Sequence, residues 1–359
     1  MKKITVLTGP LAGHGGEETV LLKFAKLLSN KFEIRLVISE NIGDTEWLEQ
    51  NKTYFTEYVS NGQGSSLKKL FFIFKSLRKF RSDIVICLTP RMVFLANLFR
   101  KVSCSKFKIV SWMQFAIKKK FDSRTAGFLS KADFHLAINT EIKRELEALK
   151  IDSSKISVVF NPVESKSRVI KNNTKEKKFL YVGRIQYQEE KNLCELIKGL
   201  KSYTNNKDWQ LDIYGADDSE DYEETKKCKK LIEKLGIAEQ VNWHGFHKDV
   251  WRLVSEADCL LLTSTTEGFG MVLCEAISYG LPVISSDCPS GPRDIVNKDN
   301  GFLYTMGNIE ELSTAIGEFI NGKVNFDPKK VKCSIGKMYT AEYTKRIENC
   351  LLNYLSYSN

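Results

Sequence analysis

Two carboxylates, Glu267 and Glu275, have the spacing in this chain that most directly suggests chemistry. Residues 260–262 end an apolar run typical of a buried strand, and residues 263–270 form a loop of small side chains. From 271 to 279 the apolar residues recur at helical spacing. A helix throughout this interval would place the two carboxylates roughly 12 Å apart. That is about the distance between the sugar and the ribose of a nucleotide sugar, so each carboxylate could accept hydrogen bonds from hydroxyls.

The backbone between these carboxylates offers an anion site. Its N–H groups belong to Gly268, Phe269, Gly270 and Met271, at the start of the predicted helix. N–H groups in a first helical turn have no partner inside the helix, and the helix dipole adds positive potential there. The segment therefore predicts two hydroxyl acceptors that flank a phosphate-binding turn. The alternative is an ordinary surface loop, because many helices have an acidic residue near their start.

Two cations follow another predicted strand, residues 179–182. Arg184 comes directly after the strand, and Lys191 comes after a polar loop. Arginine can hold a phosphate with two parallel hydrogen bonds, whereas lysine acts as a point charge. The pair could neutralise a phosphate, or it could be ordinary surface charge, and its spacing alone leaves both interpretations open.

A glycine turn near the N-terminus gives another candidate anion site. Residues 4–8 predict a buried strand, and a helical pattern covers residues 20–28. Between them, Gly15 and Gly16 would let a phosphate or sugar approach the backbone closely. The turn does not match the dinucleotide fingerprint G-x-G-x-x-G, so a tight turn without a ligand is the alternative.

Strands alternate with helices along both halves of the chain, which predicts an α/β fold. We expect two doubly wound, Rossmann-like parallel sheets that face each other across a cleft, with ligands at the carboxyl ends of the strands. Because Asn161-Pro162 interrupts the pattern, we place the domains at residues 1–162 and 163–335, with 164–178 as a linker. The expected strands are 4–8, 32–39, 54–59, 83–88, 107–112, 134–138, 156–160, 179–182, 209–214, 241–245, 260–262 and 283–284, and the expected helices are 20–28, 67–81, 91–99, 142–149, 222–235, 250–257, 271–279, 309–320 and 338–355.

Length and cysteine usage limit the class of protein. The chain has 359 residues, which suggests two domains, and no run of 18 or more apolar residues predicts a transmembrane helix. The apolar N-terminal run turns directly into the glycine loop, which favours a first strand over a signal peptide. Nine cysteines are scattered without C-x-x-C pairs, which favours reduced thiols in a cytosol over disulfides or a zinc site.

The formal net charge of +10 is concentrated in the first half of the chain. Residues 1–162 contain 27 Lys and Arg against 15 Asp and Glu, whereas the remainder contains 27 against 29. A basic half indicates an acidic partner, which could be anionic lipid, a phosphorylated glycan or nucleic acid. No recognised nucleic-acid-binding motif is present, so we do not expect nucleic acid as a partner.

Residues 67–81 predict a basic amphipathic helix. Apolar residues at helical spacing alternate there with lysine and arginine, and such a helix suits an anionic membrane surface. The alternative is a helix that covers the sheet while its basic face is solvated. The apolar residues are Leu67, Leu70, Phe71, Phe74 and Leu77, and the basic residues are Lys68, Lys69, Lys75, Arg78, Lys79 and Arg81.

Together these motifs resemble the retaining glycosyltransferases of family 4, over essentially the whole chain. The most specific part is E-G-F-G-x-x-x-x-E at residues 267–275. The Gly-Arg…Lys motif at 183–191 and the Gly-Gly turn with its glutamate at 15–18 match in order and spacing. The segment SSDCPSGPRD, residues 285–294, is similar to a subgroup that acts on cell-surface polysaccharides. Within it, the pattern most resembles the lipopolysaccharide core 1,6-galactosyltransferases, whose donor is UDP-galactose.

The resemblance implies the glycosyltransferase B fold and transfer of a hexose from a nucleotide sugar of the UDP-galactose or UDP-glucose type. It implies that Arg184 and Lys191 neutralise the diphosphate and stabilise the leaving group. Glu275 would bind the ribose, Glu267 the hydroxyls of the donor sugar, and Gly16 the diphosphate. No metal or other cofactor is implied, and the chain shows no cluster of metal ligands that would suggest one.

The same resemblance implies front-face attack with retention of configuration, in which the leaving phosphate helps to take the acceptor proton. That fits the absence of an obvious nucleophile in the sequence. Many family members carry a histidine in the loop after the strand that ends here at Trp112, whereas this chain has Gln114. Glutamine cannot change its charge, so the role left to Gln114 is a hydrogen bond to the sugar. Residues 336–359 would form a final helix that packs back on the N-terminal domain.

Two hypotheses follow. In the first, the chain is an enzyme that extends a membrane-anchored or lipid-linked glycan, as a peripheral protein on the cytoplasmic face of the membrane. Its basic N-terminal domain would bind the acceptor's phosphates or the bilayer. In the second, the chain is a catalytically silent relative that acts as partner or chaperone of an active transferase. The intact Glu267, Glu275, Arg184 and Lys191 argue against the second hypothesis, and Gln114 keeps it open.

Overall fold

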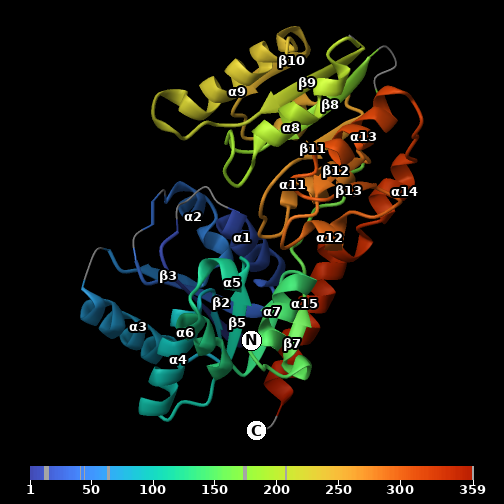
Figure 1. The fold of residues 1–359 in the computed structure, drawn as a ribbon. Coiled ribbons are helices and arrows are strands. Elements are labelled where there is room, and N and C mark those ends of the chain that lie inside the picture. The colour runs from blue at the N-terminus through green and yellow to red at the C-terminus, as the bar shows by residue number, and fades with distance from the viewer. Residues whose placement is uncertain are drawn as a thin grey trace. The chain divides into compact units, whose positions relative to one another are not determined.

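The computed structural model describes residues 1–11, 16–40, 42–43, 45–62, 65–172, 176–206 and 208–357. It divides the chain into two units: unit 1 comprises Met1–Pro162 together with Thr340–Asn359, and unit 2 comprises Val163–Tyr339. Each unit is built on an open parallel sheet with helices between successive strands (Figure 1). The expected fold class of two doubly wound α/β domains is therefore confirmed.

Unit 1 contains a seven-stranded sheet in the order β3-β2-β1-β4-β5-β6-β7, and every pairing is parallel. β1 lies inside the sheet because its apolar residues Ile4, Val6 and Leu7 are fully buried between β2 and β4. The strand order reverses between β1 and β4, and ligands of doubly wound folds bind at such a switch point. The strands are β1 (Lys2–Thr8), β2 (Phe32–Ile38), β3 (Glu57–Ser60), β4 (Ile84–Cys87), β5 (Lys108–Met113), β6 (Phe134–Ala137) and β7 (Ile156–Val158).

Side-chain caps fix where several helices of unit 1 begin. Ser65, Thr89 and Asn139 each accept a hydrogen bond from a backbone N–H in the first turn of the helix that follows. The helices are α1 (Gly16–Leu28), α2 (Glu46–Gln50), α3 (Ser66–Phe80), α4 (Pro90–Val102), α5 (Ile117–Lys120), α6 (Ser123–Ala126), α7 (Thr140–Ala148) and α15 (Thr340–Ser356), with 3₁₀ turns at Lys52–Tyr54, Gly127–Lys131 and Ser153–Lys155.

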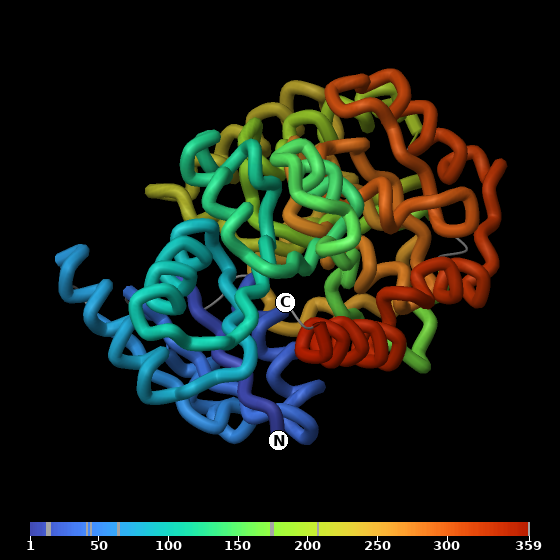
Figure 2. Tube along the Cα trace, turned by 90° about the horizontal axis from the view of Figure 1, so that it is seen from below, coloured from blue at the N-terminus to red at the C-terminus, as the bar shows by residue number. Residues whose placement is uncertain are grey.

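The final helix, α15, packs on unit 1 although it follows unit 2 in the chain. The guanidinium of Arg346 donates two hydrogen bonds, of 2.9 and 3.2 Å, to the carbonyl oxygen of Val159. The ring of Tyr354 stacks on Phe134 with 4.1 Å between the ring centroids. Figure 2 shows the red final helix beside the blue helix α1. These contacts hold α15 at the β6–β7 end of the sheet.

Unit 2 repeats the arrangement with six parallel strands in the order β10-β9-β8-β11-β12-β13. Its switch point lies between β8 and β11. The strands are β8 (Lys177–Val182), β9 (Trp209–Tyr214), β10 (Val241–Gly245), β11 (Cys259–Leu262), β12 (Val283–Ser286) and β13 (Gly301–Tyr304). The helices are α8 (Leu193–Gly199), α9 (Glu223–Lys234), α10 (Val250–Leu253), α11 (Met271–Ser278), α12 (Pro292–Ile295), α13 (Ile309–Ile320) and α14 (Pro328–Cys333), with 3₁₀ turns at Lys201–Tyr203, Glu220–Tyr222, Ala238–Gln240 and Gly336–Met338.

The prediction that residues 164–178 form a linker between the domains is wrong, because the described residues of this segment belong to unit 2. Ile170 is 2% exposed, and its N–H donates to the carbonyl of Tyr279 at 3.0 Å. Val163, just before this segment, is also buried and donates to the carbonyl of Met338. Isolated apolar side chains in a polar run thus find partners in the unit 2 core, which a composition argument does not detect.

All nine cysteines carry free thiols, as the scattered pattern in the sequence predicts. Six of them are buried, and Cys104 and Cys333 are exposed. The described part of the chain contains no helix whose length and hydropathy would let it cross a bilayer.

Candidate active site

The carboxyl end of β8 is shaped by a close approach of two backbone segments. A Cβ atom on Gly215 would lie 1.8 Å from the carbonyl oxygen of Gly183, so only glycine fits at position 215. The N–H of Gly183 donates to the carbonyl of Tyr214 at 3.0 Å, and the Tyr181 hydroxyl donates to the carbonyl of Arg184 at 2.7 Å. These contacts fix the backbone from which the Arg184 side chain projects, half exposed, at the edge of the sheet.

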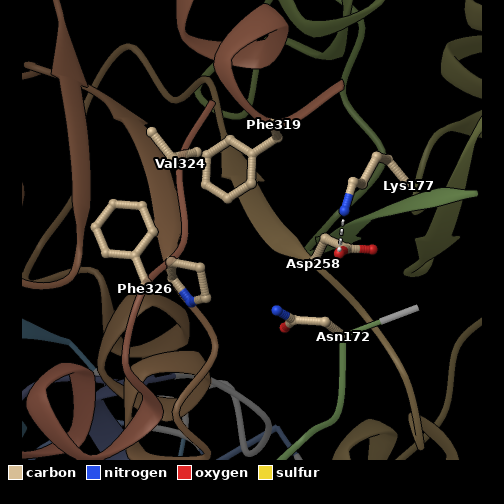
Figure 3. Close-up of a pocket in the computed structure, with 7 residues that line it drawn as sticks. Asn172, Lys177, Asp258, Phe319, Val324 and Phe326 are labelled. Carbon is tan, nitrogen blue, oxygen red and sulfur yellow. Dashed lines mark hydrogen bonds and ion pairs between the residues drawn. The ribbon is translucent and has the colours of Figure 1, made fainter. Parts of the chain in front are cut away.

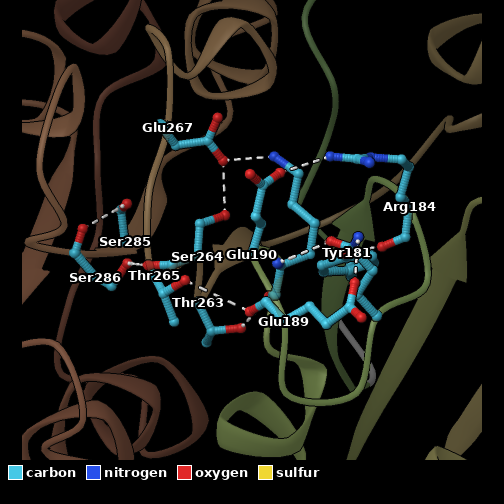
Figure 4. A network of polar contacts seen from close by, with 12 residues as sticks. Tyr181, Arg184, Glu189, Glu190, Thr263, Ser264, Thr265, Glu267, Ser285 and Ser286 are labelled. Atoms are coloured by element: carbon cyan, nitrogen blue, oxygen red, sulfur yellow. Dashed lines mark hydrogen bonds and ion pairs between the residues drawn. The ribbon is translucent and has the colours of Figure 1, made fainter. Parts of the chain in front are cut away.

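Both predicted cations are paired with carboxylates (Figure 4). Arg184 donates to Glu190 at 2.8 Å, and both side chains are about half exposed. The ammonium of Lys191 lies 2.6 Å from Oε1 of Glu267, and these side chains are 17% and 9% exposed. The structure therefore brings together Lys191 and Glu267, which the sequence placed in separate motifs. Water screens the Arg184–Glu190 pair strongly and the Lys191–Glu267 pair much less.

A hydrogen-bonded network holds Glu267 in place. The Ser264 hydroxyl donates to Oε1 of Glu267 at 2.6 Å, the atom that also contacts Lys191. The Ser286 hydroxyl donates in turn to the carbonyl of Ser264 (Figure 4). The N–H of Glu267 donates to the carbonyl of Pro289. The carboxylate thus has a fixed position at the carboxyl ends of β11 and β12.

Threonines join this loop to the loop that carries the cations. The Thr263 hydroxyl contacts the carbonyl oxygens of Lys191 and Asn192 at 3.2 and 3.0 Å. The N–H of Thr265 donates to the carbonyl of Glu190 at 2.8 Å (Figure 4). Sequence reasoning missed this serine and threonine set. Its signal was the polar run LTSTTE directly after an apolar strand, because a buried hydroxyl needs a partner.

Two glycines allow the turn before α11. Gly270 caps the helix with φ +89°, a left-handed conformation that suits glycine, and Met271 begins the helix. Gly291, with φ +111°, approaches so closely that a Cβ there would lie 2.0 Å from the carbonyl oxygen of Phe269. The Ser290 hydroxyl donates to the carbonyl of Gly268 at 3.3 Å. The Ser-Gly-Pro turn therefore acts as a support for the candidate phosphate-binding turn.

Glu275 lies in α11 and has a partner that the sequence did not suggest. Nε1 of Trp251 donates to Oε2 of Glu275 at 2.9 Å. The Trp251 ring stacks on Tyr279, with 5.4 Å between centroids and 23° between planes. The indole thus orients the carboxylate predicted to bind a ribose, while Glu267 is oriented separately by Lys191 and Ser264. Trp251 was missed because a lone tryptophan in a short helix forms no motif.

In unit 1, the predicted site residues lie at the carboxyl ends of the strands. Gly16 begins α1, and Gly15 lies outside the described residues. Gln114 directly follows β5 and is 7% exposed, and its Nε2 has no hydrogen-bond partner among the described residues. Burial raises the pKa of Glu17, next to Gly16, to about 7, and the charge of Lys120 opposes that rise. Unit 1 therefore carries a carboxylate near its glycine turn, Glu17, that the sequence motifs did not indicate.

Cys288 lies near Glu267, but its chemistry is unsuited to nucleophilic attack. It is 2% exposed, and burial together with the charge of Glu267 raises the pKa of its thiol to about 12. At neutral pH the sulfur is a neutral thiol, which is a poor nucleophile. Within the described ranges, no three His, Cys, Asp or Glu side chains gather as metal ligands.

A small cavity lies at the opposite edge of the unit 2 sheet (Figure 3). Lys177 begins β8 and Asp258 precedes β11, so this is the amino edge of those strands. The two side chains contact each other at 3.3 Å. The volume is about 20 Å³, which holds one water molecule and no larger ligand. The lining residues are Asn172, Lys177, Asp258, Pro282, Phe319, Val324 and Phe326.

Comparison with known proteins places this fold and site in a family. The model of the glycosyl transferases group 1 matches residues 163–334. Lipopolysaccharide 1,6-galactosyltransferase of Salmonella typhimurium is 34% identical over 368 residues, which cover 98% of this chain and 99% of that protein. The enzyme of the same name from Escherichia coli is 32% identical over 366 residues, with 99% of each chain covered.

Comparison with solved structures identifies the same kind of protein. The apo form of the lipopolysaccharide outer core galactosyltransferase WaaB superposes with a TM-score of 0.87 at 32% identity, over 98% of this chain and 99% of that one. HepE of Anabaena in complex with UDP gives a TM-score of 0.83 over 98% and 100% of the chains, and at 18% identity it supports the fold alone.

The two parallel-sheet units and the carboxyl-edge site define a glycosyltransferase of the B-type fold. The chain belongs to the glycosyltransferase group 1 family and is similar over its full length to lipopolysaccharide 1,6-galactosyltransferases. The resemblance drawn from the sequence motifs is thereby confirmed, and the chain is an enzyme, a hexosyltransferase.

Proposed function

We propose that this enzyme transfers galactose, with retention of configuration, from UDP-galactose to a lipopolysaccharide core acceptor. The observation that carries the proposal is the contact between Lys191 and Glu267 at the carboxyl edge of unit 2. In this contact the cation proposed to bind the diphosphate lies directly beside the carboxylate proposed to bind sugar hydroxyls. The full-length relatives named as 1,6-galactosyltransferases support the choice of sugar and acceptor.

The geometry suits stabilisation of a departing diphosphate. In the transfer, the bond between the anomeric carbon and the diphosphate oxygen breaks while the acceptor oxygen bonds to the same face of that carbon. The acceptor proton passes to the leaving phosphate, and UDP departs. Arg184 and Lys191 would offset the charge that develops on UDP, with the backbone at Gly268, Phe269, Gly270 and Met271 adding dipoles. No protein nucleophile is needed, and the neutral Cys288 thiol is consistent with that.

The two carboxylates would bind different ends of the donor, Glu267 the sugar and Glu275 the ribose. Lys191 and Ser264 both contact Oε1 of Glu267, so among the described residues Oε2 is left to accept from sugar hydroxyls. Trp251 donates to Oε2 of Glu275, and this hydrogen bond would orient the carboxylate for a ribose hydroxyl. Gly16 and Gln114 of unit 1 are further donor-contact candidates, and the unpaired Nε2 of Gln114 supports a hydrogen bond to the sugar.

The silent-partner hypothesis has no support in the comparisons, since the full-length relatives are named as transferases. For the setting of the reaction, we propose a cytoplasmic enzyme that associates peripherally with the membrane carrying its acceptor. The positive excess of residues 1–162 supports attraction to phosphorylated glycans or anionic lipid. We propose that no metal is required, because the two cations can supply the positive charge.

Calorimetry with the full chain tests the proposal. UDP and UDP-galactose should bind in the presence of EDTA, while GDP and ADP should bind at least tenfold more weakly. Lys191→Ala should weaken UDP binding, whereas Lys201→Ala, on the exposed turn after α8, should leave it unchanged. Absence of UDP binding, or equal binding by Lys191→Ala and the wild type, would refute the proposed site. Tighter binding of another UDP-sugar would refute galactose alone.

A further inference from the structure

A groove in unit 1, between α3 and α4, has no role in the transfer described above. Its volume is about 870 Å³, and it reaches the amino ends of β4 and β5. α3 and α4 lie next to each other (Figure 1). The candidate donor residues of unit 1 lie at the carboxyl ends of the strands, so the groove is at the other edge of the sheet. Its lining includes Phe71, Phe74, Phe99 and Phe107, and the basic residues Lys75 and Arg78.

The floor of the groove is aromatic. The Phe74 and Phe99 rings meet edge to face with 5.2 Å between centroids, and Phe99 stacks on Phe107 at 6.3 Å. Beside this floor, Phe71 is 74% exposed and Val102 is 72% exposed. Leu67, one turn earlier on α3, is 68% exposed. An exposed set of large apolar side chains around an apolar groove indicates a surface that binds something apolar.

The structure corrects the expected apolar face of α3. Ile73, Leu77 and Phe80 are the residues buried against the sheet, whereas Leu67 and Phe71 face away from it. The helix therefore both covers the sheet and keeps apolar side chains exposed. The sequence offered a membrane-binding helix and a sheet-covering helix as alternatives, and these describe different faces of α3.

The rim of the groove is cationic. Lys75, Arg78, Arg81 and Lys106 are all exposed, and no lining residue is acidic. Among the described residues, none of these four side chains makes a hydrogen bond or an ion pair. Unpaired cations around apolar side chains attract an amphiphile with an anionic head.

Two other basic residues of α3 are paired with carboxylates. Lys69 pairs with Glu40 at 3.1 Å, and Lys79 pairs with Glu57. Their charges are partly neutralised within the protein. Near the groove α3 thus carries the unpaired cations Lys75 and Arg78, whereas Lys69 and Lys79 are paired; Lys68, near the start of the helix, is exposed and does not line the groove.

We propose that the α3–α4 groove docks on the anionic surface of a phospholipid bilayer. Leu67, Phe71 and Val102 enter the interface, and Lys75 and Arg78 meet lipid phosphates. This inference rests on the proposed function in one respect, the membrane-borne acceptor that gives the enzyme a reason to dock. It differs from the sequence-based prediction because it excludes Lys69 and Lys79 from the contact.

The test is co-sedimentation of the full chain with vesicles of phosphatidylcholine, with and without phosphatidylglycerol. The wild type should bind only the anionic vesicles, more weakly as salt is raised. Lys75→Gln/Arg78→Gln should bind about 30-fold more weakly, because two cations near an anionic surface are lost. The matched control Lys69→Gln/Lys79→Gln removes the same charge from the same helix and should bind like the wild type.

A second pair of variants tests the apolar part of the proposed membrane contact. Phe71→Ser should weaken vesicle binding about tenfold, whereas Leu352→Ser, an exposed apolar residue on α15, should not. Thermal unfolding and UDP binding should be unchanged in all four variants, which separates this inference from the proposed function. Equal losses in test and control variants, or undiminished binding by Lys75→Gln/Arg78→Gln, would overturn the proposal. So would a dimer in ultracentrifugation that Phe71→Ser dissociates, since the groove would then bind a second copy.

Discussion

Nζ of Lys191 lies 2.6 Å from Oε1 of Glu267 and links the loop after β8 to the loop after β11. The two side chains are 17% and 9% exposed, so each charge depends on the other for compensation. The ammonium is therefore held in position, and little reorganisation is needed when a diphosphate arrives.

Lys191→Met should lower kcat/KM for sugar transfer by about 100-fold or more, because the diphosphate loses a fixed cation. The same change should lower the free energy of unfolding by about 1–3 kcal/mol, since Glu267 keeps its charge without Lys191. Steady-state kinetics and chemical denaturation measure the two effects. In Lys191→Met/Glu267→Gln the stability should recover while activity stays low. Recovery of both would make the pair a structural feature only.

Glu190→Gln should strengthen UDP binding slightly. Glu190 competes with the diphosphate for Arg184, but both side chains are about half exposed and the pair is worth at most about 1 kcal/mol. The expected gain is no more than about fivefold in Kd, measured by calorimetry at low salt. A loss of affinity would instead mean that Glu190 is needed to orient Arg184.

Trp251→Phe should raise KM for the donor about three- to tenfold with little change in kcat. The substitution keeps an aromatic ring against Tyr279 and removes the N–H that orients Glu275. A hydrogen bond to a charged group contributes roughly 1.5–3 kcal/mol, and only the part of it that orients Glu275 for the donor affects KM. Tyr279→Phe is the control, because it leaves the indole N–H in place. If both variants show the same KM, Trp251 does not act through Glu275.

Gly291→Ala should destabilise unit 2 by about 2–4 kcal/mol and lower activity, because its Cβ would collide with the carbonyl of Phe269 at a left-handed φ. Gly322→Ala is a matched control, with φ +64° and no atom within 4 Å of the added Cβ. It carries only the conformational penalty, about 1 kcal/mol. Thermal unfolding and turnover of both variants would be compared. Equal effects would show that the collision is relieved by movement of the turn.

His135 should make unit 1 sensitive to acid. Burial lowers its pKa to about 4, and its Nδ1 lies 2.7 Å from the Ser111 hydroxyl. Below the pKa of about 6.5 in the unfolded chain, only the unfolded state takes up the proton. Stability is therefore present above pH 6.5 and lost as pH falls towards 4, by up to about 3 kcal/mol from this residue.

Denaturation of the wild type and of His135→Gln between pH 7.5 and 4.5 measures this effect. The difference between the two proteins should shrink as pH falls, because the variant lacks the titrating group. The stabilities of the two proteins must be subtracted at each pH. Glu17, whose pKa is raised to about 7, changes the stability of both proteins in the opposite direction over the same pH range. Parallel curves would contradict the assignment to His135.

The sequence predicted the strands well because most of them are apolar runs ended by glycine or a polar loop, as after Val182 and Tyr214. It did not predict β13, whose four residues are too short to show a period, or the short helix α8. The helix expected over 250–257 ends at Leu253, because the backbone groups of Ser255 and Ala257 form hydrogen bonds with Lys171 instead of continuing the helix. Short elements depend on tertiary contacts more than on local pattern.

The individual site residues were visible in the sequence, but their partners were not. Glu267 and Lys191 were chosen from separate motifs, and their contact depends on β8 lying next to β11 in the sheet. Ser264 and Trp251 belong to no motif, and only the fold shows that they orient carboxylates. Charge pairing across loops requires three-dimensional proximity, which periodicity does not encode.

The position of α15 has a consequence for how the chain is made. Unit 1 is completed by residues that the ribosome adds only after all of unit 2. Until they emerge, Val159 lacks the guanidinium of Arg346, and Phe134 lacks the ring of Tyr354. Until then, α15 does not cover β7, the last strand of the nascent N-terminal sheet. An uncovered strand can pair with other chains. Unit 2, which is continuous, can finish folding first, so the order of completion is opposite to the order of translation.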